Sequence, residues 1–377
     1  MEKKIAIIGG GIAGLTFSLC LREESYSCHI FERKSDIQEV GAGISVFPNA
    51  SKVLKSIGLL DEVLAASGSM KNMHLRTSKG NYLLSTESNY DLPTICMHRA
   101  ELHRILLKHS PAVIHSGYDL ESIRENTNGK IQLFFKNGET FEADMVIGAD
   151  GIHSIVRNYV IGDGGPIYRG YNCWRGVVKS DFESGYGSET YGSGKRVGIV
   201  PIKDGYYAWW ATINEEISEN DEPEGVKNKL KRHFGDWHYP IPEFMASTDT
   251  ILKNSISDRP ITKGWHKGNV VLLGDAAHPT TPNLGQGGCM AMEGAYLLAK
   301  CLEKYGISEI AYKRYETLQF PRAKQIIEGA LQLGKIGQLS NPVFTTIRNF
   351  LFWITPSSLA VKIFDKYFEH DVTSMHI

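Results

Sequence analysis

The sequence predicts an α/β protein in which a helix-covered parallel sheet is interrupted by a β-rich insert and followed by C-terminal helices. A buried strand at residues 4–8 runs through a glycine-rich turn, residues 9–14, into a helix, and the next apolar run ends at Glu32. From about residue 166 to residue 260, strand-like runs rich in Tyr and Trp replace this pattern. A buried strand at 270–273 then restores it. We therefore expect a Rossmann-like domain with an inserted β-sheet domain.

Each glycine of the opening turn has an expected task. Gly9 permits the tight turn, Gly11 lets the backbone approach a pyrophosphate, and Gly14 lets the helix pack closely on the strand. Glu32 follows Gly14 by 18 residues, where its carboxylate can accept hydrogen bonds from ribose hydroxyls. A glycine turn without a ligand is the alternative, but strand, helix, strand and acid occur here in the required order. The sequence therefore predicts a dinucleotide site.

Composition excludes several classes of ligand. The 377 residues exceed one ordinary core and indicate about two domains. Lys and Arg number 41 against 42 Asp and Glu, a net charge of −1, so we expect no nucleic acid and instead a small molecule. The six cysteines show no C-x-x-C pair and no zinc spacing, which predicts a cytoplasmic protein without a metal site. No apolar run reaches the roughly 18 residues of a spanning helix.

Periodicity predicts further elements. Hairpins are expected at 73–84 and 132–143, a buried strand at 145–149, and helices at 97–107 and from about 288 to 302. Residues 344–355 read as a helix rich in aromatic side chains and are followed by Pro356. For this helix we favour docking of the aromatic face on the body or on a second subunit over contact with a membrane surface.

Three glycine-bearing strand ends are expected to meet in space. They are the segments 9–14, 148–151 and 274–279. Ligands bind beyond the carboxyl ends of strands in α/β sheets, so Asp150 and Asp275 are suited to hold ribose or ribityl hydroxyls. For Asp275, a turn or a helix cap remains the alternative.

These residues together resemble a known family. The turn with Glu32, the motif from Gly148 to Arg157, and the segment 274–279 with 285–288 are similar to the FAD-dependent aromatic hydroxylases, the single-component flavoprotein monooxygenases. The resemblance covers nearly the full chain. Residues 43–50, 174–176 and 194–197 are similar to the branch that contains urate hydroxylases, salicylate hydroxylases and zeaxanthin epoxidases.

The resemblance implies a set of FAD-contacting residues. The turn would hold the pyrophosphate, Glu32 the ribose, Asp275 the flavin-side hydroxyls, and the amides of 285–289 the isoalloxazine. Asp150 and Arg157 match a motif that serves both FAD and NAD(P)H. Since one G-x-G-x-x-G is present, NADH or NADPH would bind transiently over the flavin. The implied cofactor residues are Gly9, Gly11, Ala13, Gly14, Glu32, Arg33, Ser45, Arg99, Leu120, Asp150, Asp275, Gly285, Gln286, Gly287, Gly288 and Cys289.

The implied activity is hydroxylation of an aromatic or heteroaromatic small molecule with O2, through a flavin C4a-hydroperoxide. Arg196 matches an arginine beside substrate and flavin and is the implied catalytic residue, although a surface arginine is the alternative. A tyrosine that the urate hydroxylases place twelve positions later is Ala208 here, which leaves urate specificity open. His278 is expected in the cofactor loop. Aromatic candidates for the substrate pocket are Tyr168, Tyr171, Trp174, Tyr207, Trp209 and Trp210.

Two other functions remain open. One is epoxidation or double-bond reduction of a polyene or isoprenoid, and the other is a flavin-binding module without turnover. The expected domains are an FAD-binding domain at 1–165 and 261–340, a substrate domain at 166–260 and a helical segment at 341–377. Segments near 73–95 are expected to contribute to the substrate side. The protein is expected to be a monomer or a homodimer.

Overall fold

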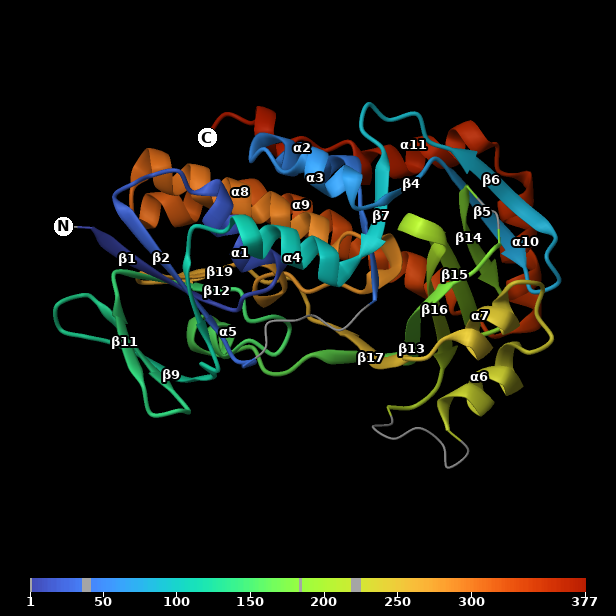
Figure 1. The fold of residues 1–377 in the computed structure, drawn as a ribbon, viewed down its shortest axis with the longest axis horizontal. Helices are drawn as coiled ribbons and strands as arrows, with labels where there is room; N and C mark the ends of the chain where they lie inside the picture. The colour runs from blue at the N-terminus through green and yellow to red at the C-terminus, as the bar shows by residue number, and fades with distance from the viewer. Residues whose placement is uncertain (1, 36–41, 183–184, 218–224) are drawn as a thin grey trace.

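A computed structural model describes residues 2–35, 42–182, 185–217 and 225–377. Its first layer is a six-stranded sheet at the left of Figure 1 in which every pairing is parallel except that of the last edge strand, β18. Strand β1 lies inside this sheet because Ile5, Ala6 and Ile7 are fully buried on both faces. In spatial order the strands are β18 (His266–Lys267), β19 (Val270–Leu272), β12 (Met145–Gly148), β1 (Lys3–Ile8), β2 (Tyr26–Glu32) and β8 (Val113–Ser116).

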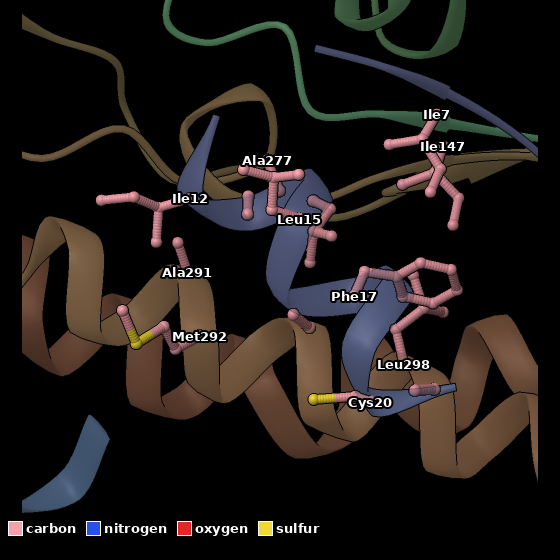
Figure 2. Packing of buried hydrophobic residues seen from close by; sticks show 14 of the residues in the cluster. Ile7, Ile12, Leu15, Phe17, Cys20, Ile147, Ala277, Ala291, Met292 and Leu298 are labelled. Atoms are coloured by element: carbon pink, nitrogen blue, oxygen red, sulfur yellow. The ribbon is translucent and has the colours of Figure 1, made fainter. Parts of the chain in front are cut away.

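The core of this layer lies between the sheet and a pair of packed helices. Leu15 and Phe17 of α1 are fully buried and pack beside Ala291, Met292 and Leu298 of α8 (Figure 2). Small residues at the start of α8 let the two helices approach closely. The helices of this part are α1 (Ile12–Cys20), α2 (Pro48–Ser56), α3 (Leu60–Ala65), α4 (Arg99–His109), α5 (Ile155–Val160), α8 (Gly287–Tyr305) and α9 (Glu309–Gly337).

A seven-stranded sheet at the right of Figure 1 forms the second layer. Helices α6 (Val226–Phe234) and α7 (Ile241–Ser247) cover its outer face, where Trp174 and Trp209 are buried against them. Because side chains alternate along a strand, the neighbouring residues Arg175, Ala208 and Trp210 face inward. The strand order is β17 (Leu252–Asp258), β13 (Ile167–Lys179), β16 (Tyr206–Asn214), β15 (Lys195–Pro201), β14 (Tyr186–Tyr191), β5 (Asn72–Thr77) and β6 (Tyr82–Glu87).

Within the described ranges, two small sheets and four short 3-10 turns complete the connections. The three-stranded sheet β9–β11 lies at the lower left of Figure 1, and the other small sheet is ordered β3-β7-β4. The strands are β3 (Gly43–Val46), β4 (Gly68–Met70), β7 (Thr94–His98), β9 (Leu120–Glu125), β10 (Ile131–Phe135) and β11 (Thr140–Ala143). The 3-10 turns are η1 (Lys203–Gly205), η2 (Gly274–Ala276), η3 (Pro282–Leu284) and η4 (Val372–Ser374).

The C-terminal helices α10 (Pro342–Ile354) and α11 (Ser357–Phe368) lie beside the second sheet, at the upper right of Figure 1. Helix α10 buries Arg348 and turns its apolar side chains outward, except Phe352, which packs against Tyr191. We call the exposed apolar side chains of these helices the outer face. They are Val343, Phe344, Ile347, Phe350, Leu351, Trp353, Ile354, Leu359 and Ile363.

The expected fold class is confirmed, as are both hairpins: β5 pairs antiparallel with β6, and β10 with β11. The helix expected from Met97 begins at Arg99 because residues 94–98 form β7, which pairs with β3 and β4. The helix expected at 344–355 is present as α10. Docking of its aromatic face on the body is wrong for Phe344, Phe350 and Trp353, which are exposed, whereas Phe352 packs on Tyr191. Docking on a second subunit stays a prediction. Among the described residues, no helix combines the length and apolarity needed to cross a bilayer.

Candidate active site

One cavity of about 1170 Å³ joins the carboxyl edge of the first sheet to the inner face of the second. Its wall includes Gly11 and Glu32 at one end and Arg196 and Trp210 at the other. Pockets for a single small molecule measure about 300–1,000 Å³, so this cavity is large enough for two ligand groups. The carboxyl ends of β1, β2 and β12 meet at its rim, as expected for a ligand site in an α/β sheet.

In the glycine turn after β1, two glycines allow close packing and the third faces open space. Gly9 has φ +110°, and a Cβ there would lie 2.4 Å from the Ala149 carbonyl oxygen. A Cβ on Gly14 would lie 2.3 Å from the Gly9 carbonyl oxygen, so α1 packs tightly on the turn. A Cβ on Gly11 would meet nothing within 4 Å, and Gly11 lines the cavity. The space before Gly11 therefore fits a pyrophosphate held against backbone N–H groups.

Glu32 is fixed in place at the same end. Its Oε2 accepts a hydrogen bond of 3.0 Å from the Gly10 amide, and its Oε1 accepts one of 3.0 Å from the Lys34 amide. The remaining acceptor positions of the carboxylate are free to face ribose hydroxyls in the cavity. Arg33 and the buried Leu120 line the cavity beside it. This end has the donors and acceptors that an adenosine requires.

Asp275 follows β19, is exposed, and lines the cavity. Desolvation by the surrounding protein raises the pKa of the Asp275 carboxyl, and the Arg99 guanidinium opposes that rise. Ala13, Ser45 and Arg99 also line the cavity. This position fits a carboxylate that accepts hydrogen bonds from hydroxyls of a bound cofactor.

The N-terminus of α8 forms the next part of the wall. Gly285, Gly287 and Gly288 line the cavity, and Gly285 has a left-handed φ of +65°. The side chains of Gln286 and Cys289 lie behind the wall, where Gln286 Oε1 accepts from Asn49 Nδ2 at 2.9 Å. Any contact that these two residues make with a cofactor is therefore through their backbone. The unpaired N–H groups of a helix N-terminus suit a negatively charged ligand atom.

Asp150 lines the cavity but uses its carboxylate to begin α5. It accepts from Ser154 Oγ at 2.5 Å and from the amides of Ile155 and Val156 at 2.8 and 3.2 Å. Burial raises the pKa of Asp150, and these hydrogen bonds oppose the rise. Arg157 is buried and pairs with Asp163 at 2.5 Å. It also donates to two backbone carbonyls just after Asp275, so this motif positions the Asp275 loop.

Arg196 is buried at the far end of the cavity, and all three nitrogens of its guanidinium donate hydrogen bonds. Its Nη1 donates to Glu189 Oε1 at 2.8 Å, its Nη2 to Asn283 Oδ1 at 2.6 Å, and its Nε to Gln338 Oε1 at 3.0 Å. A Cβ on Gly337 would lie 2.7 Å from three atoms of this side chain, so α9 packs directly on the guanidinium. The surface-arginine alternative is wrong.

The charge of Arg196 is balanced locally. Burial alone would lower the pKa of its guanidinium, but Glu189 and nearby tyrosines hold it above the usual value. Burial, followed by Glu189, raises the pKa of Tyr191, whose hydroxyl donates to Glu189 Oε2 at 2.8 Å. Arg196 and Glu189 therefore form a buried ion pair whose own two charges cancel. A second buried guanidinium, that of Arg348, lies 5.0 Å from the Tyr191 ring centre and interacts with both members of the pair.

The aromatic candidates fall on both faces of the second sheet. Trp210 faces the cavity, because its indole lies over Gly198, where a Cβ would clash at 1.9 Å. Trp209 borders the cavity, but its Nε1 donates to Thr248 on the outer side. Trp174 and Tyr207 belong to the outer core, and neither they nor Tyr168 and Tyr171 line the cavity. Tyr171 instead accepts from Asn283 Nδ2 at 3.0 Å.

Several wall residues escaped sequence reasoning. Glu189 and Tyr191 occupy alternate positions on β14, and this spacing could have indicated that the two residues share a face of the sheet. Asn283 and the apolar residues of α9–α11 carry no comparable signal. The apolar end of the cavity is lined by Met70, Met73, Leu75, Leu84, Leu333, Phe352, Val361 and Phe364.

His278 follows Asp275 in the loop and is fully buried. Burial lowers its pKa to about 4, so the ring is neutral at pH 7. It packs near Trp265, with ring centroids 5.3 Å apart. His278 therefore acts as an uncharged packing residue of the loop, and it does not line the cavity.

The family described as "FAD binding domain" matches residues 2–330. The chain belongs to the FAD-dependent aromatic hydroxylases. It is 35% identical over 358 residues to aurachin C monooxygenase/isomerase of Stigmatella aurantiaca, covering 91% of this chain and 92% of the relative. It is 29% identical to 2-heptyl-3-hydroxy-4(1H)-quinolone synthase of Pseudomonas aeruginosa, covering 97% of each.

Among solved structures, HpxO of Klebsiella pneumoniae complexed with FAD and uric acid superposes with a TM-score of 0.86 and 26% identity, covering 96% of this chain and 95% of that one. Full-length coverage means that both sheets, and not only the glycine turn, match this family. The chain is an FAD-binding enzyme, and its relatives include 3-amino-4-hydroxybenzoate 2-monooxygenase of Streptomyces cremeus and FAD-dependent urate hydroxylase of Mycolicibacterium vanbaalenii.

Proposed function

We propose that this protein uses FAD, NAD(P)H and O2 to hydroxylate an uncharged heteroaromatic ring that carries an apolar tail. The observation that carries the proposal is the single cavity, which runs from the open glycine turn past Asp275 to the neutral Arg196–Glu189 pair and then between apolar walls. Two ligands placed end to end would meet where α8 begins. That junction is where a flavin ring and a substrate ring would lie.

The cofactor end suits FAD on the geometry of its own residues. The open side of Gly11 would receive the pyrophosphate, Glu32 the adenosine ribose, and Asp275 the hydroxyls nearer the flavin. Arg99 beside Asp275 and the amides of Gly287 and Gly288 complete the seat. Bound FAD would supply the redox chemistry, taking hydride from NAD(P)H and passing electrons to O2.

The protein's own groups would orient the substrate and shield the flavin ring from water. Backbone N–H groups at the start of α8 would stabilise negative charge on the reduced ring system. Arg196, held by Glu189, Asn283 and Gln338, keeps one geometry and can present its remaining N–H groups to a substrate oxygen. The apolar walls exclude water, which suppresses unproductive release of reduced oxygen.

The substrate class follows from charge and from the walls. A buried guanidinium already paired with Glu189 gives little net attraction for an anionic ring, so an uncharged ring fits better. Leu333, Phe352 and Phe364 at the same end suit an alkyl or isoprenoid chain. The heptyl-quinolone named for one relative has this combination of ring and tail.

We further propose a division of labour along the chain. Residues 1–165 and 261–340 would hold FAD, and residues 166–260 would hold the substrate together with β5 and β6, which lie in the same sheet. Residues 341–377 would close the apolar end, because Phe352 and Phe364 belong to its wall.

The proposal is tested with the FAD-loaded protein and a panel of ring compounds. NAD(P)H oxidation should accelerate with an uncharged alkyl quinolone and much less with urate, and a hydroxylated product should accumulate. Asp275→Ala should weaken FAD retention, whereas Arg196→Ala should keep the yellow colour and lower product per NAD(P)H. Acceleration by urate alone would overturn the substrate class, and no acceleration by any ring would overturn the activity.

A further inference from the structure

Helix α10 has its polarity reversed relative to an ordinary surface helix. Its one buried side chain is Arg348, whose Nη1 donates to the Gly337 carbonyl at 3.2 Å and whose guanidinium lies 5.0 Å from the Tyr191 ring centre. Trp353 is 67% exposed and Phe344 is 56% exposed. Soluble helices turn their apolar stripe toward the core, so this orientation needs a partner outside the chain.

The outer face is also concentrated. Nine of the seventeen large apolar side chains that are exposed in the described part of the chain lie between residues 343 and 363. Scattered apolar residues are normal on a surface, but a contiguous group of this size marks an interaction site. The group spans α10 and α11, which stand together at one corner of the molecule (Figure 1).

Charge indicates the kind of partner. Helix α10 contains no Asp or Glu. Between residues 335 and 368 the one carboxylate is Asp365, which accepts a hydrogen bond from Tyr90 at 3.0 Å, whereas Lys335, Lys362 and Lys366 are exposed. Exposed Trp and Phe flanked by lysines suit the boundary between acyl chains and anionic headgroups.

The outer face is continuous with the cavity. Ile363 is 49% exposed and also lines the apolar end, and Phe352 lines that end between the exposed Leu351 and Trp353. A second copy bound over these helices would cover this edge. A bilayer would leave it open to molecules dissolved in the lipid.

We propose that the α10–α11 outer face docks on the surface of an anionic lipid bilayer, with the apolar end of the cavity turned toward the lipid. Apolar-tailed substrate would then enter without crossing water, a consequence that rests on the proposed function. The docking itself requires no turnover. It is a surface association, because neither helix spans the lipid.

The test is flotation of the FAD-loaded protein with vesicles of phosphatidylcholine, alone or mixed with phosphatidylglycerol. The protein should float with the mixed vesicles, less with phosphatidylcholine, and less at high salt. Replacing Phe350 and Trp353 together by Ser should lower binding by at least about tenfold. Ile310→Ser in α9, which removes an equally exposed apolar side chain elsewhere, should bind like wild type.

Light scattering and a solution assay separate the other outcomes. Wild type and the double variant should have the same mass in solution, the same FAD content and the same NAD(P)H oxidation with a water-soluble ring. A dimer that the double variant converts to a monomer would assign the face to a second copy and overturn the proposal. Equal vesicle binding by the double variant, or no binding by wild type, would overturn it as well, whatever the outcome for activity.

Discussion

Arg196 shows how a single residue can be predicted in place but not in electrostatic state. Its position matched the arginine of a known family, and it does line the cavity. Its partners come from β14, η3 and the end of α9, which are far apart in the chain. No local pattern could have shown that Glu189 neutralises it, because that pairing depends on the register between β14 and β15.

Glu189→Gln tests the neutral-pair interpretation. The amide keeps a hydrogen bond to Arg196 but leaves the guanidinium with an uncompensated charge. We expect affinity for an anionic ring such as urate to rise about tenfold, which corresponds to about 1.4 kcal/mol of binding free energy. Affinity for an uncharged ring should fall. Titrations followed by flavin absorbance give both dissociation constants. Glu215→Gln, which breaks the ion pair with Lys229 elsewhere, is the control, and unchanged affinities in Glu189→Gln would refute the interpretation.

His278 predicts how stability depends on pH. Burial lowers its pKa from 6.5 to about 4, so the unfolded chain takes up the proton first as the pH falls. Above pH 6.5 the neutral His278 therefore does not lower the free energy of unfolding. Between pH 6.5 and pH 4 it lowers that free energy progressively, by about 3 kcal/mol at pH 4. Thermal unfolding of His278→Gln across that range should show a shallower loss than wild type. Parallel pH profiles would contradict the assignment of a buried neutral ring.

At the scale of elements, the alternation of side chains along strands decides which aromatic residues reach the cavity. Tyr207 and Trp209 face α6 and α7, whereas Ala208 and Trp210 face the cavity. The sequence contains this period of two, but it does not show which face a helix will cover. The predicted pocket list therefore mixed both faces. The positive φ of Gly9 and the close packing of Gly14 were predictable because the motif itself requires them. The approach of a pyrophosphate to Gly11 stays a prediction.

The glycine turn allows a matched comparison between two glycines. Gly11 has ordinary extended dihedral angles and an open side, so Gly11→Val should fold with a Tm close to that of wild type but bind FAD at least about tenfold more weakly. Gly14→Val should lower the Tm itself, because its side chain meets the Gly9 carbonyl at 2.3 Å. Apoprotein melting and FAD titration measure the two effects. A Gly11→Val protein that retains FAD with wild-type affinity would refute the pyrophosphate seat.

The close approach of α9 to Arg196 gives a second prediction. Gly337→Ala places a methyl group 2.7 Å from the Arg196 side chain, so the guanidinium must move. We expect FAD content to be unchanged and product per NAD(P)H to fall about tenfold or more, because small displacements of a positioning group are costly. The neighbouring Ile336→Ala, which trims a 40% exposed side chain, should leave coupling intact. Equal coupling in the two variants would count against Arg196 as the orienting group.

At the scale of the whole molecule, the two-layer architecture followed from the order of strand patterns. The addition of β5 and β6 to the second sheet did not, beyond the expectation that segments near 73–95 lie on the substrate side. Strand β5 pairs with β14 across more than 100 positions of the chain, and β6 joins the sheet through β5. Such long-range register leaves no local trace. The outward face of α10 was also unpredictable, since aromatic content does not say which side of a helix packs.

The most direct test of the account is the fate of molecular oxygen. Holoprotein is supplied with NAD(P)H, an uncharged alkyl quinolone and ¹⁸O2, and the product mass is measured. We predict a hydroxylated ring carrying one ¹⁸O atom. A product that lacks the label, or NAD(P)H oxidation that yields hydrogen peroxide with every ring offered, would contradict a monooxygenase built around this cavity.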